Sequence, residues 1–202
     1  MTIIERKARE KEQRRMSILM AAEKLFARDG YTATSLDQVA QEVEISKGTI
    51  YLYFKNKEDL FFTLIRERFE TLIQKVTEKI AETQTLEELV TVGIRVMLDE
   101  TRKQHYLFRL TSAEQTKIKS ISHRELRSQI MSIRDTYIRA LEMAIDNFIP
   151  KGLNVSSRSI ALVMTGAINA VMVEWMISNQ TIDLEPLKND IAKIILQGIA
   201  HD

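Results

Sequence analysis

The chain has 202 residues, of which 45% are hydrophobic and 28% are charged, so it can bury a sizeable core beneath a soluble surface. It contains no cysteine, which excludes disulfides and thiolate metal sites, and its net charge is only +1. Any binding of nucleic acid must therefore come from local clusters of basic residues. Six glycines and two prolines over this length favour long helices rather than many strands and tight turns.

The first helical pattern begins near Arg14, and Asp29-Gly30 supplies a stop signal at its end. The preceding stretch, Arg6–Arg15, is rich in basic residues but is interleaved with glutamates. Two interpretations are open. The stretch is either a solvated helical extension or a basic arm that reaches DNA, in which case Arg14 and Arg15 are the best candidates for contact.

Two short helical segments follow. Thr34-Ser35 offers capping residues before a short apolar pattern that ends near Val43, and Ser46 is placed to cap the next segment, SKGTIYLYF. Two short helices separated by so tight a turn predict a helix-turn-helix.

The second helix of this motif has too many polar side chains for a core element. Lys47, Thr49, Tyr51 and Tyr53 offer an ammonium group and hydroxyls, which phosphate oxygens and base edges accept as donors. Gly48 lets the backbone approach a partner closely. The alternative is that the two tyrosines only anchor the turn to the first helix.

The rest of the chain shows helical spacing and no sustained alternation of period two. We expect helices over 58–81, 86–102, 122–149 and 156–179, a shorter element near Tyr106–Glu114, and a last helix capped by Asp183. Pro150 and Gly152 should end the long helix over 122–149. The predicted fold is all-α, with a helix-turn-helix domain over residues 1–57 and a helical ligand-binding and dimerisation domain over 58–202.

The stretch from Ile18 to Leu60 resembles the DNA-binding domain of the TetR family of transcriptional regulators. It carries A-x-x-L-F-x-x-x-G-Y, then T-S and L-x-x-V-A, and then S-K-G-T-I-Y-x-Y-F-x-N-K-E-x-L, almost without gaps. The helices that follow are similar to the family in number, order and length.

This resemblance implies a regulator, usually a repressor, that binds a palindromic double-stranded DNA operator. It places the third helix in the major groove, makes Lys57 a phosphate clamp, and puts Thr34 and Ser35 at a helix N-terminus that suits a phosphate. The implied DNA-binding residues are Thr34, Ser35, Lys47, Gly48, Thr49, Tyr51, Tyr53 and Lys57.

Two positions depart from the family pattern. Glu44 occupies the turn position that glycine commonly fills, where a positive φ would cost about 1 kcal/mol. Asp37 stands where a basic or polar residue is usual, and it could serve the helix dipole. Both leave the operator sequence open.

Two recognition helices related by a two-fold axis would give the affinity that one short helix lacks. The helix over 160–177 is apolar around most of its circumference, and together with the last helix it resembles the family's dimer interface. Its uncharged run, Ile160–Val173, has 14 residues, fewer than the roughly 20 that cross a bilayer, so we expect a cytoplasmic protein without a membrane partner.

The resemblance also implies a small-molecule effector, which we expect to be largely apolar because the C-terminal half is rich in methionine. Each candidate side chain could equally belong to an ordinary core or to the dimer interface. The candidates are Met97, Phe108, Arg109, Met131, Tyr137, Met164, Asn169 and Glu174.

No catalytic or metal-binding cluster is expected: the three histidines lack metal-ligand spacing, and no phosphate loop or nucleophile elbow is present. No cofactor is predicted either. Besides the ligand-released repressor, two alternatives stay open. The helical body could bind another protein instead of a small molecule, or the whole chain could be a helical enzyme or scaffold that does not bind DNA.

Overall fold

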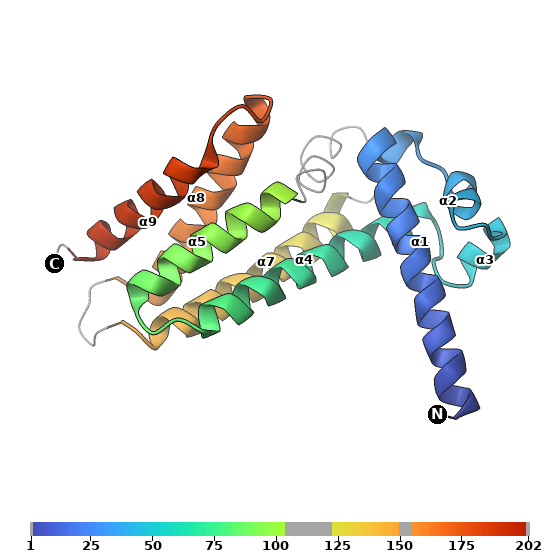
Figure 1. Cartoon of the computed structure of the whole chain (residues 1–202), viewed down its shortest axis with the longest axis horizontal. Helices are drawn as coiled ribbons and strands as arrows, with labels where there is room; N and C mark the ends of the chain where they lie inside the picture. The colour runs from blue at the N-terminus through green and yellow to red at the C-terminus, as the bar shows by residue number, and fades with distance from the viewer. Residues whose placement is uncertain (1, 104–122, 150–154, 201–202) are drawn as a thin grey trace. The chain divides into compact units, whose positions relative to one another are not determined.

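The computed structural model describes residues 2–103, 123–149 and 155–200, and all regular structure in these ranges is helical (Figure 1). The all-α prediction is confirmed. The expected short element near Tyr106–Glu114, and the stop at Pro150 and Gly152, lie outside the described residues. The helices are α1 (Ile3–Ala33), α2 (Leu36–Glu42), α3 (Lys47–Tyr51), α4 (Lys57–Ala81), α5 (Leu86–Lys103), α7 (His123–Asp146), α8 (Ser157–Ile177) and α9 (Leu184–Ala200).

The chain divides into two compact units, and the division falls within α4. The first unit holds the chain up to Arg68 and the second begins at Phe69, with the part of α7 from Gln129 onward also in the second. The sequence pattern placed a boundary at residue 57, where α4 begins.

Helix α1 begins 11 residues before the position expected from the sequence. Thr2 and Glu5 form a capping box, in which the Glu5 amide donates to the Thr2 hydroxyl (3.2 Å) and the Thr2 amide donates to the Glu5 carboxylate (2.8 Å). The residues between this cap and Arg14 are exposed good helix formers without an apolar stripe, so periodicity alone could not reveal them. Gly30, with φ 82°, interrupts the helix at the expected stop, although helical residues continue to Ala33.

An aromatic cluster holds the first unit together. The Phe26 ring lies 5.7 Å from that of Tyr31 and 5.4 Å from that of Phe61, and the Tyr31 and Phe61 centroids are 4.8 Å apart. Burial raises the pKa of Tyr31 to about 12, and the nearby Glu58 carboxylate adds to this. Because Phe61 belongs to this cluster, the first turns of α4 are part of the same core as α1.

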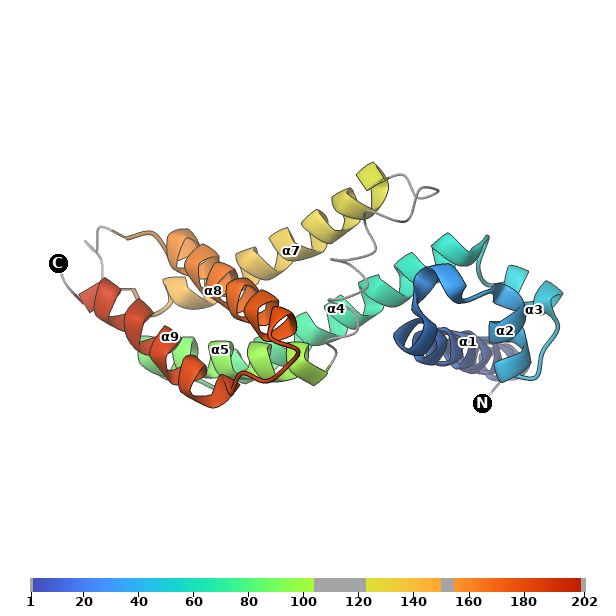
Figure 2. The same cartoon turned by 90° about the horizontal axis from the view of Figure 1, so that it is seen from above.

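The second unit is built around α5, which packs against α8 and α9 while these two also pack against each other (Figures 1 and 2). Gly93 allows a close approach here, since a Cβ atom at this position would lie 3.2 Å from Met164 Cε and 3.6 Å from Ile80 Cγ2. A side chain at this position would require the end of the Met164 side chain to shift. The buried hydrophobic residues of α5, α8 and α9 include Leu89, Val90, Ile94, Leu98, Ile160, Ala161, Met164, Ile168, Met172, Trp175, Leu184, Ala192 and Ile195.

Helix α8 is longer than its uncharged run suggested. By length and composition alone, its 21 residues with mean hydropathy 1.8 are sufficient to cross a membrane. It packs against α5 and α9, however, and a core helix of a soluble protein meets the same criteria.

Candidate nucleic-acid interface

The α2–turn–α3 segment forms as predicted, with a serine cap at the start of each helix. Ser35 Oγ accepts from the Gln38 amide (3.3 Å), and Ser46 Oγ accepts from the Thr49 amide (3.1 Å). The turn closes when the Ile45 amide donates to the Ala40 carbonyl (2.9 Å). These bonds fix the direction of α3 relative to α2.

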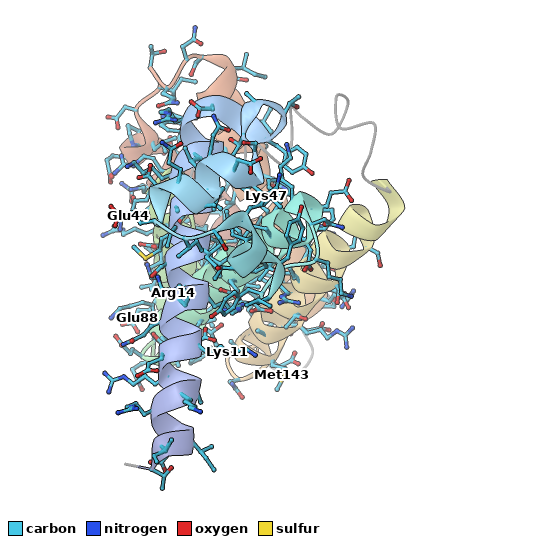
Figure 3. The ribbon with its side chains drawn as sticks, turned by 90° about the vertical axis from the view of Figure 1, so that its right-hand side faces the viewer. Lys11, Arg14, Glu44, Lys47, Glu88 and Met143 are labelled. Atoms are coloured by element: carbon cyan, nitrogen blue, oxygen red, sulfur yellow. The ribbon has the colours of Figure 1, made fainter. Side chains whose placement is uncertain are left out.

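Glu44 takes the left-handed conformation that its position required, with φ 54°. The Glu44 side chain is exposed, and it is labelled in Figure 3. A glutamate therefore fills the usual glycine position, at a cost in backbone strain of about 1 kcal/mol.

Helix α3 presents a polar surface that is exposed among the described residues of the first unit. Lys47 and Gly48 are exposed, Thr49 is half-buried, and Tyr51 is 50% exposed. A Cβ atom at Gly48 would meet only Ser46 Oγ, at 3.6 Å, so the fold itself does not require glycine there. The missing side chain instead leaves room for a partner outside the protein.

Of the two tyrosines, only Tyr53 could serve mainly as an anchor, because it is half-buried whereas Tyr51 projects outward. Leu52, which sequence reasoning passed over, is 76% exposed between them. An apolar side chain held in water directly after α3 is suited to contact a sugar or a thymine methyl group. Its position in the sequence between Tyr51 and Tyr53 was the available signal.

Asp37 forms an ion pair with the recognition helix. Its carboxylate accepts a hydrogen bond from Lys47 Nζ at 2.8 Å, and this bond raises the pKa of the lysine. Both side chains remain largely exposed, so the pair is weak and a phosphate or base edge can compete for the ammonium. Asp37 thus holds Lys47 in place over the surface of α2 and α3.

Two residues expected at the DNA have different partners in the structure. Thr34 is only 2% exposed and its hydroxyl donates to the Gly30 carbonyl (2.8 Å). Lys57 Nζ donates to the carbonyls of Tyr31 and Thr34, at 2.8 Å each, and lies 4.3 Å from the Tyr31 ring centroid. Thr34 therefore offers no side chain to a phosphate, and Lys57 ties the start of α4 to the end of α1. Ser35 remains half-buried beside them, at the N-terminus of α2.

Two ion pairs join α1 to α4 within the first unit. Arg68 Nε donates to Glu23 at 2.8 Å with a second bond from its Nη2, and Arg15 pairs with Glu67. Arg15 is therefore engaged inside the protein, although the sequence made it a candidate for DNA contact. Its carboxylate partners lie on both α1 and α4.

The candidate ligand residues differ in their burial. Tyr137 and Met164 are buried in the second unit and Met97 is half-buried, whereas Met131, Asn169 and Glu174 are exposed on their helices. Phe108 and Arg109 lie outside the described residues.

Tyr137 has an unusual environment. Its hydroxyl is buried and has no hydrogen-bond partner among the described residues, and burial raises its pKa. An unsatisfied buried hydroxyl costs about 1–3 kcal/mol. Such a group is well suited to receive a polar atom of a bound molecule.

Comparison with known proteins gives matches along nearly the whole chain. Residues 18–64 match the family model of bacterial regulatory proteins of the tetR family, and residues 65–198 match that of the YsiA-like protein C-terminal region. The chain is 28% identical over 194 residues to the fatty acid metabolism regulator protein of Bacillus subtilis, covering 95% of this chain and 98% of the relative.

Solved structures agree with this fold. The transcriptional regulator FadR from Bacillus subtilis in complex with stearoyl-CoA has a TM-score of 0.75 and 28% identity, over 91% of this chain and 98% of that one. The fatty acid degradation regulator FadR from Bacillus halodurans has a TM-score of 0.76 at 23% identity, over 94% and 97%. The chain therefore belongs to the tetR family of bacterial regulatory proteins, and it is a DNA-binding transcriptional regulator.

Proposed function

We propose that this protein is a cytoplasmic, homodimeric repressor that binds a palindromic operator through α3 and is released by a long-chain fatty acyl-CoA. The observation that carries the DNA-binding part is the exposed polar surface of α3, which two serine caps and the turn at Glu44 hold in place. The proposal also rests on relatives that are described as transcriptional regulators.

The contacts with DNA come from α3 and its flanks. Lys47 and Thr49 offer donors to base edges, and Gly48 lets the helix backbone approach the groove. Tyr51 and Tyr53 are directed to phosphates, and the Ser35 end of α2 supplies free amides for another phosphate. Thr34 and Lys57 are left out because the protein itself occupies their polar groups.

The proposed effector is based on a relative whose solved structure contains a ligand. The B. subtilis structure at 28% identity contains stearoyl-CoA, and the acyl chain of such a ligand needs a long apolar cavity. In this chain, the buried Met164 and Met172 give adaptable apolar surface, and the Tyr137 hydroxyl provides an unsatisfied polar group. Release requires that the ligand bind the DNA-free form more tightly than the bound form.

The DNA part is tested by selecting fragments from a genomic library at two salt concentrations. We expect the wild-type chain to enrich a palindrome, with affinity that falls as salt rises. Tyr51→Ala should lose the enrichment, while Met143→Ala, which changes an exposed side chain on α7, should keep it. Salt-sensitive binding without an enriched sequence would contradict recognition of a specific operator. Absence of binding would favour the alternative of a helical scaffold or enzyme that does not bind DNA.

The effector part is tested by adding stearoyl-CoA to the complex with the selected operator. We expect release at concentrations where coenzyme A alone has no effect, and weaker release from Tyr137→Phe. Coenzyme A as the control shows whether the acyl chain is what the protein recognises. A wild-type complex that stearoyl-CoA leaves intact would instead favour a helical body that binds another protein.

A further inference from the structure

The N-terminal half of α1 extends as an exposed helix past α2 and α3 (Figure 1). Residues 2–17 contain six basic and three acidic side chains, and the Thr2–Glu5 capping box starts the helix at its free end. A helix of this kind that buries no apolar face is held by its cap, its propensity and its junction with the core. Its exposed charges are therefore available to a partner.

Ion pairs engage some of these charges. Arg6 pairs with Glu10 (3.5 Å), and Arg15 pairs with Glu12 (2.9 Å) and with Glu67. Across the parts of the chain that the structure describes, three exposed basic residues of the extension that share one stripe have no acidic partner. They are Lys7, Lys11 and Arg14.

This basic stripe (Lys7, Lys11 and Arg14) continues the apolar face of α1. Steps of four, three and four residues lead from Lys7 to Ile18, and eleven residues turn an α-helix through about three full turns. Ile18 is buried in the core of the first unit, and the helix is uninterrupted between the two residues. The stripe thus faces the same side of α1 as the helices that pack on it.

Figure 3 looks onto the face of the first unit that carries Lys47. The extension of α1 runs through the same view, with Lys11 and Arg14 labelled on it. A duplex lying against α3 would therefore continue alongside the extension. From Lys7 to Arg14 the helix rises about 10 Å, a length over which one DNA strand presents about three phosphates.

We propose that the basic stripe binds phosphates of the DNA that flanks the half-site read by α3. This inference rests on the proposed function, because it assigns a second contact to the same duplex. Arg9 and Arg6 are directed away from the stripe and take no part. Phosphate contacts position a protein without reading sequence, so the stripe adds affinity and length of contact rather than specificity.

The test compares two double variants of the full chain that lose the same charge from the same helix. Lys7→Gln with Lys11→Gln removes two members of the stripe, and Arg6→Gln with Arg9→Gln removes two charges from the other side. Glutamine keeps the helix propensity of the residues it replaces. Affinity is measured against salt on the operator selected by the wild type, and on an unrelated duplex of equal length.

We expect the slope of log K against log salt to become shallower by about 1.8 for the stripe variant and to stay at the wild-type value for the control, since each phosphate contact contributes about 0.9. Trimming the operator to the base pairs read by α3 should abolish the difference. Equal slopes for the two variants on both duplexes would overturn the stripe. A wild type that selects no operator would overturn the proposed function instead. The salt dependence of affinity for the unrelated duplex would then still test whether the basic stripe binds phosphates.

Discussion

At the scale of single residues, Lys57 shows how one side chain can have two plausible roles. The family pattern makes it a phosphate clamp, whereas its ammonium donates to two carbonyls at the end of α1, at 2.8 Å each, and lies over the Tyr31 ring. We predict that Lys57→Met lowers the free energy of unfolding of the first unit by about 1–3 kcal/mol, because it leaves these carbonyls without their charged donor. Chemical denaturation followed by circular dichroism measures this.

Lys55→Met is the matched control, since Lys55 is an exposed lysine two residues away and no ion pair involves its side chain in the described parts of the chain. The Lys55→Met variant should have a free energy of unfolding within about 0.5 kcal/mol of the wild-type value. If Lys57→Met kept full stability but lost DNA affinity, the phosphate clamp would be the correct assignment.

The residues that sequence reasoning placed correctly are those whose partners lie nearby in the chain. Ser35 and Ser46 cap the helices that follow them, and Glu44 takes the positive φ of the turn. For Thr34 and Lys57 the structure adds intramolecular partners that the sequence did not indicate, because these partners are backbone carbonyls and no residue type at those positions marks them. Tyr137 could be recognised as a candidate, but only the fold shows that its hydroxyl lacks a partner.

At the scale of elements, helix existence was predictable and helix ends were less so. The apolar periodicity that marks α4, α5 and α8 comes from burial, and it is absent from the start of α1, which is exposed. That helix is instead made by the Thr2–Glu5 cap and by residues of high propensity. A threonine followed three residues later by glutamate was the signal that could have revealed it.

Glu100 links α5 to α4, and this link should depend on pH. Hydrogen bonds from Lys103 and Lys75 (2.7 and 2.6 Å) lower the pKa of its carboxyl, and the residue is only 8% exposed. A carboxyl whose pKa is lowered on folding contributes stability that is present above its unfolded value, here 4.5, and is lost as pH falls through the folded value.

We therefore predict that Glu100→Gln lowers the free energy of unfolding by about 1–3 kcal/mol at pH 7, and that the difference from wild type shrinks below pH 4.5. Urea denaturation over a series of pH values checks this. Glu87→Gln, an exposed carboxylate on the same helix, serves as the control. A difference that stayed constant down to pH 3 would mean that Glu100 acts through packing rather than charge.

At the scale of the whole molecule, one face of α8 is left uncovered by the described residues of the second unit. Exposed small and apolar residues recur along it at steps of three and four, and they are Leu162, Gly166, Ala170, Val173 and Ile177. Ile177 is 70% exposed, and a Cβ atom at Gly166 would meet nothing within 4 Å. Such a stripe fits close packing against an identical helix from a second copy, which a palindromic operator also requires.

We predict that Val173→Arg separates the dimer, because it would place an unpaired charge at the centre of that stripe. An uncompensated buried charge costs about 3–5 kcal/mol, which corresponds to a loss of dimer affinity of at least 100-fold. Light scattering should give wild type twice the chain mass of 23.4 kDa and the variant close to that mass itself. Met143→Arg, which places the same charge at a more exposed apolar residue on α7, should remain dimeric. A wild type that stayed monomeric at micromolar concentration would contradict the homodimer, and a Val173→Arg dimer would place the interface elsewhere. Loss of the dimer together with loss of palindrome binding would tie assembly directly to DNA recognition.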